Sequence, residues 1–227
     1  MSEKHDLGLY LKPTYFIDSN SPTIIAYANA TCHGKDTDMD RAIALYYGVR
    51  DDIRYDPYRI EDKREAVRAS SVLKRKAGFC VPKAVLLTAV LRSQKIPARL
   101  GFADVKNHLV TQRLKALMEI DLFVYHGYIE VFLNDKWVKA TPAFNLGLCQ
   151  NFNVKPLEFD GIHDSLFHEY DIHGNRHMEY VNDHGTYADL PYDAIFGAFR
   201  RYYPKIFALN LDGDAEAFSR EALDENY

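Results

Sequence analysis

Three side chains in the middle of this chain have the types and the spacing that a cysteine nucleophile and its base require. Cys80 stands directly before an apolar stretch, and His126 and Thr141 lie in a second segment further along. The positive end of a helix dipole lowers the pKa of a thiol placed there, and the thiolate is the nucleophilic form. A thiolate beside an imidazole can attack a carbonyl carbon and form a thioester. A small, unreactive core residue is the alternative interpretation of Cys80.

Residues 81–95 are predicted to form the helix behind Cys80. Pro82 suits the first turn of a helix, where its missing N–H has no helical partner. Apolar residues leave this stretch little polar face, which predicts a helix buried on nearly all sides. Gly78, just before the cysteine, allows the backbone to approach a ligand closely. Residues 96–105 follow as a strand.

A hairpin is predicted to carry the histidine. Residues 122–133 have strong β-propensity, and residues 136–141 read as the returning strand. Asn134 and Asp135 between them tolerate positive φ, which favours a tight two-residue turn.

The register of this hairpin places four residues on one face: His126, Tyr128, Thr141 and Ala143. Thr141 is then a diagonal neighbour of His126, with Cα atoms about 7–8 Å apart. A threonine hydroxyl at that place could orient the imidazole. A half-buried strand histidine with structural hydrogen bonds only is the alternative.

Three segments of the chain resemble the transglutaminase-like superfamily. "GFCVPKAVLLTAVLRSQKIPARL" (78–100) resembles its cysteine segment, and "HGYIEVFLNDKWVKATPAFN" (126–145) resembles its histidine segment. "ALYYGVRDDIRYDPY" (44–58) resembles the helix and exit that precede them. The three segments follow the family's order and cover about residues 40–145.

The resemblance implies a papain-like α+β fold, in which a buried helix presents the cysteine against an antiparallel sheet. It implies one transglutaminase-like domain over residues 1–227, with its core at 36–145. We expect residues 1–35 to form an N-terminal arm and residues 146–227 to form a C-terminal elaboration.

The resemblance also assigns roles to the site residues: Cys80 is the nucleophile and His126 the base. The family's aspartate falls at Thr141 in this chain. Three interpretations stay open. Thr141 acts as a neutral third member, a carboxylate such as Asp121 or Asp160 replaces it, or the protein keeps the fold and only binds.

An oxyanion that forms during acyl transfer needs hydrogen-bond donors. The backbone N–H of Cys80 is one expected donor, and the Tyr55 or Tyr58 hydroxyl is a second. Tyr128 and Asp160 complete the set of candidate oxyanion and substrate-binding residues.

The composition excludes several classes of function. With 28 basic and 32 acidic residues among 227, the net charge of −4 indicates neither a nucleic-acid nor a membrane partner. Three widely spaced cysteines fit a reducing cytoplasm better than a disulfide framework. We expect no phosphate-binding glycine loop, no membrane-spanning helix and no secretory signal from this sequence. The spacing of four histidines argues against a metal site: His163, His168, His173 and His177.

Patterns elsewhere predict the remaining elements. Residues 8–30 read as an extended arm with one or two strands, and residues 36–53 as a helix. Residues 61–76 read as a basic helical stretch with a solvated face, and residues 108–120 as a helix or a long loop. From residue 146 the chain is aromatic and loop-like. It ends in a helix at 191–202 and a mobile acidic tail at 211–227.

These observations predict acyl transfer through a Cys80 thioester, without a metal or an organic cofactor. The substrate would be a peptide or a small amide or ester. Hydrolysis ranks first and amide-forming transfer to an amine second. A non-catalytic binding module of the same fold is the alternative from another class. The aromatic residues between 150 and 203 suggest an apolar cleft, and aromatic packing in the core is the alternative.

Overall fold

A computed structural model describes residues 7–107, 110–166, 178–208 and 216–225. Its main sheet has four antiparallel strands in the order β5-β4-β3-β6. Their bounds are β3 (Ala98–Asn107), β4 (Leu122–Leu133), β5 (Lys136–Ala140) and β6 (Met178–Tyr187). A separate parallel pair joins the two-residue strands β1 (Arg54–Tyr55) and β2 (Ala77–Gly78).

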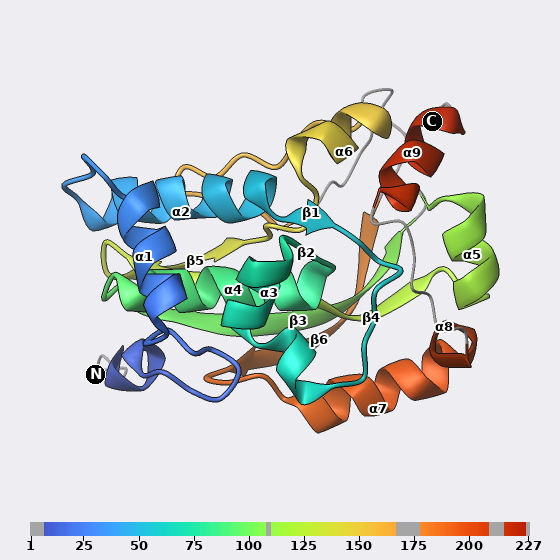
Figure 1. Cartoon of the computed structure of the whole chain (residues 1–227), viewed down its shortest axis with the longest axis horizontal. Coiled ribbons are helices and arrows are strands. Elements are labelled where there is room, and N and C mark those ends of the chain that lie inside the picture. Colours follow the sequence, from blue (N-terminus) through green and yellow to red (C-terminus); the bar gives the residue numbers. More distant parts are fainter. Residues whose placement is uncertain (1–6, 108–109, 167–177, 209–215, 226–227) are drawn as a thin grey trace.

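Helix α4 (Cys80–Ser93) lies across the sheet and forms the centre of the core (Figure 1). Every residue from Cys80 to Arg92 is buried, as the apolar pattern predicted. The helices α1 (Pro22–Thr31), α2 (Asp38–Asp52) and α3 (Ala69–Arg75) pack against α4. The chain therefore has the predicted α+β architecture, with the buried cysteine helix packed on an antiparallel sheet.

The hairpin of β4 and β5 has the predicted register. Leu133 pairs with Lys136, and the ladder runs to Ile129 opposite Ala140. Asn134 and Asp135 have φ angles of 49° and 63°, as a tight two-residue turn requires. Ile129, Val131 and Leu133 belong to the main core, whereas Tyr128 packs in a small cluster with Ala103 and Val105.

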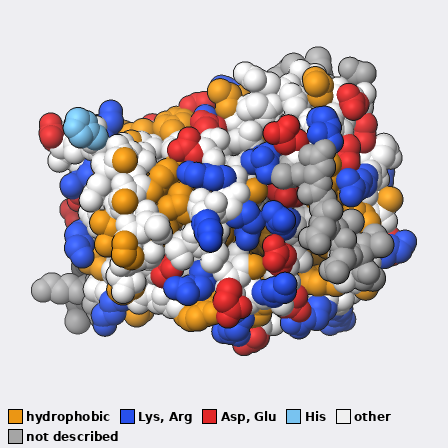
Figure 2. All heavy atoms as spheres, in the orientation of Figure 1, with side chains coloured by type: hydrophobic (Ala, Val, Ile, Leu, Met, Phe, Trp, Pro, Cys, Tyr) orange, Lys and Arg blue, Asp and Glu red, His pale blue; other side chains and the backbone are white. Residues whose placement is uncertain are grey.

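The predicted solvated face of residues 61–76 is also present. The 3₁₀ turn η2 (Arg64–Val67) and α3 bury Val67, Ala69, Val72 and Leu73. Lys63, Arg64, Lys74 and Lys76 are exposed. Figure 2 shows Lys and Arg side chains gathered in the middle of this face, with acidic side chains beside them. Part of this charge is paired, because Arg64 contacts Asp193 at 3.0 Å.

The prediction of an extended arm at residues 8–30 is wrong. The structure has a 3₁₀ turn η1 (Leu7–Leu11) and helix α1 (Pro22–Thr31) there. Ile24 and Ala28 are fully buried and lie four residues apart, on one face of that helix. Packing of this face against α4 outweighs the weak helix propensity of the Ile, Thr and Asn residues in α1.

The C-terminal part is more ordered than predicted. Strand β6 was not anticipated, because it is an edge strand without apolar alternation, and its ladder with β3 shifts register twice. The mobile tail predicted at 211–227 is wrong for residues 217–224, which form helix α9 (Ala217–Asp224). Phe218 and Ala222 are buried and lie on one face of α9, and α9 packs against α6 (Leu146–Asn151).

Helices α5 (Gln112–Met118), α7 (Tyr192–Tyr202) and α8 (Pro204–Ala208) complete the described elements. The helix predicted at 191–202 is confirmed by α7, and part of the uncertain 108–120 segment is α5. These three helices follow one another along one end of the molecule in Figure 1, and α8 contacts both of the others.

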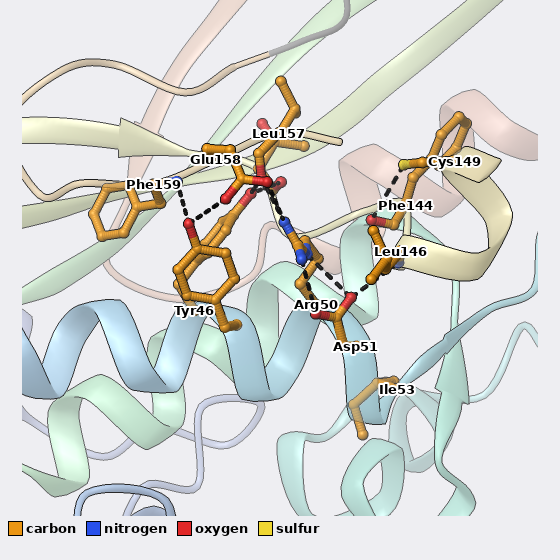
Figure 3. A network of polar contacts seen from close by, with 12 residues as sticks. Tyr46, Arg50, Asp51, Ile53, Phe144, Leu146, Cys149, Leu157, Glu158 and Phe159 are labelled. Atoms are coloured by element: carbon orange, nitrogen blue, oxygen red, sulfur yellow. Dashed lines mark hydrogen bonds and ion pairs between the residues drawn. The ribbon is translucent and has the colours of Figure 1, made fainter. Parts of the chain in front are cut away.

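A polar network fastens the segment after β5 onto α2 (Figure 3). The hydroxyl of Tyr46 and the guanidinium of Arg50 both donate to the carbonyl of Leu157, at 3.0 and 2.8 Å. Arg50 also pairs with Asp51 at 2.8 Å, and Asp51 accepts from the N–H of Leu146 at 2.9 Å. The C-terminal elaboration is therefore tied directly to a helix of the family core.

Candidate active site

Cys80 and His126 line the same cavity, which contains about 400 Å³ of space, part of it open to solvent. Cys80 is the first residue of α4, and His126 lies in β4. Both side chains are largely buried, with exposed fractions of 7% and 4%. The structure thus brings together the two residues that the sequence selected as nucleophile and base.

Gly127 makes this approach possible. A Cβ atom at this position would lie 3.0 Å from the Cα of Val81 and 3.3 Å from the carbonyl carbon of Cys80. These are backbone atoms at the start of a fully buried helix, so they have little room to move. A larger residue would push the start of α4 and the strand that carries His126 apart by a few tenths of an ångström.

Replacing Gly127 with alanine is expected to lower the free energy of unfolding by about 1–3 kcal/mol, because the new methyl group meets a packed backbone. Urea unfolding measures this. Gly197→Ala is the matched control: a Cβ at Gly197 has nothing within 4 Å, so this change in helix α7 should stabilise by up to ~1 kcal/mol. Equal stability of the wild type and Gly127→Ala would contradict the close approach.

The thiol of Cys80 is held in its neutral form. Burial raises the pKa of Cys80 to about 11, and hydrogen bonding from the backbone N–H groups of Gly127 and Val81 opposes this rise without overcoming it. The sequence predicted a lowered pKa from the helix dipole, and that prediction is wrong because desolvation is the larger effect. A nucleophilic role for Cys80 would therefore require a base that removes its proton.

A β-bulge positions the strand just before His126. The register between β3 and β4 shifts between Ala103 and Val105, and Tyr125 has a φ of 53°. The Tyr125 N–H donates to the carboxylate of Asp104 at 2.9 Å. The same carboxylate oxygen lies 2.7 Å from Nε2 of His184. Asp104 is a positioning residue that the sequence did not reveal, since no motif or alternation marks a bulge.

Thr141 lies beside His126 but is not bonded to it. The two residues line a second, smaller cavity of about 190 Å³. The Thr141 hydroxyl is buried and has no hydrogen-bond partner, while its backbone N–H donates to the carbonyl of Ser165 at 2.9 Å. The predicted proximity is therefore present, and the predicted hydrogen bond is absent from this arrangement.

Replacing Thr141 with valine is expected to leave kcat/KM within about threefold of the wild type, because the hydroxyl makes no hydrogen bond. Loss of a buried, unpaired hydroxyl should also raise the free energy of unfolding by about 1 kcal/mol. Steady-state kinetics and urea unfolding measure the two effects. A drop in kcat/KM of more than tenfold would show that the hydroxyl orients His126 during turnover.

The two tyrosines proposed as oxyanion donors differ in whether they line the cavity. Tyr55 lines the cavity with Cys80, and its hydroxyl makes no hydrogen bond to another described residue. Tyr58 does not line the cavity; its hydroxyl is engaged by Thr111 at 2.9 Å and by Glu221. Of the two proposed tyrosines, Tyr55 is thus the one that lies in the cavity with Cys80.

The other proposed substrate-binding residues lie outside the cavity that holds Cys80. The ring of Tyr128 packs on Gly101, on the other face of the sheet from the main core. Asp160 accepts hydrogen bonds from the backbone N–H groups of Ile162 and His163, both at 2.8 Å, and from the His163 ring. These bonds hold the pKa of Asp160 below its usual range. Asp121 is exposed and lies 3.7 Å from Lys106.

The described residues contain no cluster of three metal-ligating side chains. Of the four histidines weighed as ligands, His163 is exposed and contacts Asp160, and His168, His173 and His177 lie outside the described residues. None of the described helices is both long and apolar enough to cross a membrane.

A model of the transglutaminase-like superfamily matches residues 25–142, which is more than half of the chain. The chain belongs to the transglutaminase-like superfamily. The matched region contains α2, α4 and the β4–β5 hairpin, so it includes Cys80, His126 and Thr141. It ends before α7 and α8, which supply part of the wall of the Cys80 cavity. No curated protein matches the sequence.

One solved structure agrees with this transglutaminase-like fold. A candidate cysteine protease from Cytophaga hutchinsonii superposes with a TM-score of 0.53 at 15% identity, over 85% of this chain and 49% of that one. This chain thus spans about half the length of that protein. An arylamine N-acetyltransferase from Mycobacterium abscessus matches with a TM-score of 0.39 at 12% identity, over 59% of this chain and 46% of that one.

Proposed function

We propose that the protein is a cysteine-dependent acyl-transfer enzyme that works through a thioester on Cys80, with hydrolysis as its main outcome. The observation that carries this proposal is the shared cavity: a nucleophilic thiol and an imidazole line one apolar pocket at the start of a buried helix. Membership of the transglutaminase-like superfamily supports the same assignment.

The raised pKa of Cys80 determines the first step. At neutral pH the thiol is protonated, so His126 takes the proton while Sγ attacks the carbonyl carbon of an amide or ester. The backbone N–H of Cys80 and the Tyr55 hydroxyl are the candidate donors to the oxyanion. The Sγ–C bond forms, the C–N or C–O bond breaks, and His126 returns the proton to the leaving group.

The second step resolves the thioester. His126 removes a proton from water, the water oxygen attacks the thioester carbon, and the Cys80 thiol is restored as the acid leaves. An amine can take the place of water. The apolar lining lowers the amount of water near the thioester, so amide formation is the second outcome beside hydrolysis.

The partition between water and an amine tests the proposed function. The protein is mixed with 4-nitrophenyl acetate, with and without butylamine, and acetate, N-butylacetamide and 4-nitrophenol are quantified. The proposal expects release of 4-nitrophenol above the buffer rate, with acetate in excess of the amide. A larger yield of amide would make the protein an acyltransferase, and no release above buffer would favour a binding module.

A further inference from the structure

The walls of the Cys80 cavity, beyond the reacting residues, are apolar. They are lined by aliphatic and aromatic side chains that include Ile60, Leu114, Met118, Phe123, Phe199 and Ile206. Among the described residues that line the cavity, His126 is the single side chain that can carry a charge at neutral pH. Burial raises the pKa of the Tyr55 and Tyr203 hydroxyls, so both tyrosines are neutral.

The polar atoms of this wall are already engaged, with one exception. The Tyr203 hydroxyl accepts from the N–H of Val124 at 2.6 Å and donates to the carbonyl of Leu122 at 2.9 Å. Tyr203 can therefore contact a ligand through its aromatic ring. The Tyr55 hydroxyl has no such partner among the described residues. Apart from the reacting residues, the Tyr55 hydroxyl is therefore the polar group that this lining offers. The rest of the lining suits a part of the substrate that makes no hydrogen bonds.

Part of the apolar wall comes from outside the segment that defines the family. Phe199 lies in α7, Tyr203 is the C-cap residue of α7, and Ile206 lies in α8. Both helices follow the matched region 25–142, and α8 packs against α5 (Figure 1). The catalytic residues are thus supplied by the family core, while α7 and α8, which follow that core, help to shape the space beside them.

We infer that this cavity selects an uncharged, apolar acyl group. The inference rests on the proposed function and adds the substrate class. A carboxylate or ammonium group there would lose its hydration, and beyond the reacting His126 and the Tyr55 hydroxyl the described lining offers it no free polar partner. Each methylene group buried should instead raise kcat/KM about three- to fourfold.

Three 4-nitrophenyl esters test this selectivity: the acetate, the 3-phenylpropanoate, and the succinate monoester, in which a carboxylate replaces the phenyl ring. The kcat/KM of the phenylpropanoate is expected to exceed that of the acetate at least about tenfold and that of the succinate at least about 100-fold. Ile206→Lys should lower the ratio of phenylpropanoate to succinate kcat/KM at least tenfold. Leu223→Lys is the matched control, because Leu223 is 59% exposed and does not line the cavity, and it should leave the ratio unchanged.

Calorimetry separates this inference from the proposed function. The Cys80→Ala variant should bind 3-phenylpropanamide at least tenfold more tightly than succinamate, whether or not the wild type turns over. Equal kcat/KM for the three esters, with acylation of Cys80 by each, would overturn the selectivity and leave the proposed function standing. Failure of every ester to acylate Cys80 would remove the proposed function, and equal binding of the two amides would then remove the selectivity as well.

Discussion

Replacing Cys80 with alanine is expected to lower kcat/KM for ester cleavage by at least about 10⁴-fold, because the covalent route through a thioester is lost entirely. Alanine keeps the buried position filled by an apolar side chain and removes one atom, Sγ. The helix start should therefore survive, and α4 should stay packed on the sheet. Steady-state cleavage of 4-nitrophenyl 3-phenylpropanoate measures the loss, and far-UV circular dichroism checks the fold.

Two other cysteines provide controls for this variant. Cys32 and Cys149 are buried, do not line the Cys80 cavity, and each has its sulfur 4.0 Å from a backbone carbonyl oxygen. Cys32→Ala and Cys149→Ala should keep kcat/KM within about twofold of the wild type. A Cys80→Ala variant that retains more than a tenth of the wild-type rate would exclude Cys80 as the nucleophile.

Replacing His126 with glutamine is expected to lower kcat/KM by about 10²- to 10⁴-fold, the usual contribution of a general base. Glutamine keeps a polar side chain of similar reach and cannot take the thiol proton. His163→Gln is the matched control, since His163 is exposed and lies outside both cavities. An unchanged kcat/KM in His126→Gln would assign the base to another residue.

The residual activity of His126→Gln should depend on pH in a defined direction. Without the base, the rate follows the fraction of Cys80 in its thiolate form. Because the pKa of Cys80 is raised to about 11, this fraction grows about tenfold per pH unit between pH 7 and 10. The wild type should show a weaker dependence there, since its base removes the proton during attack. A residual rate that is flat above pH 8 would mean that the thiol ionises at a lower pH.

The sequence was sufficient to predict the centre of the fold, where local patterns and long-range packing agree. The apolar residues after Cys80 indicate a helix buried all round, and α4 is such a helix. The Asn134-Asp135 turn sets the register of the hairpin, which in turn places His126 and Thr141 side by side. These features depend on residues close together in the chain.

Features that depend on contacts between distant segments could not be predicted in this way. Helix α1 has weak helix propensity and is stabilised by packing on α4. The bulge at Tyr125 depends on Asp104, which lies 21 residues earlier on the neighbouring strand. The pKa of Cys80 depends on how deeply the thiol is buried, which no local pattern reveals. The cavity wall from Phe199 and Ile206 arises only when α7 and α8 pack beside the core.

The central claim is that an acyl group is transferred to Sγ of Cys80. Mixing the protein with an excess of 4-nitrophenyl 3-phenylpropanoate, quenching in acid within seconds, and mapping the digested peptides by mass spectrometry tests it most directly. One 3-phenylpropanoyl group per molecule is expected on the peptide that contains Cys80, and none on the peptides of Cys32 or Cys149. An acyl group on any other residue, or an unmodified Cys80 peptide under conditions where the ester is consumed, would contradict it.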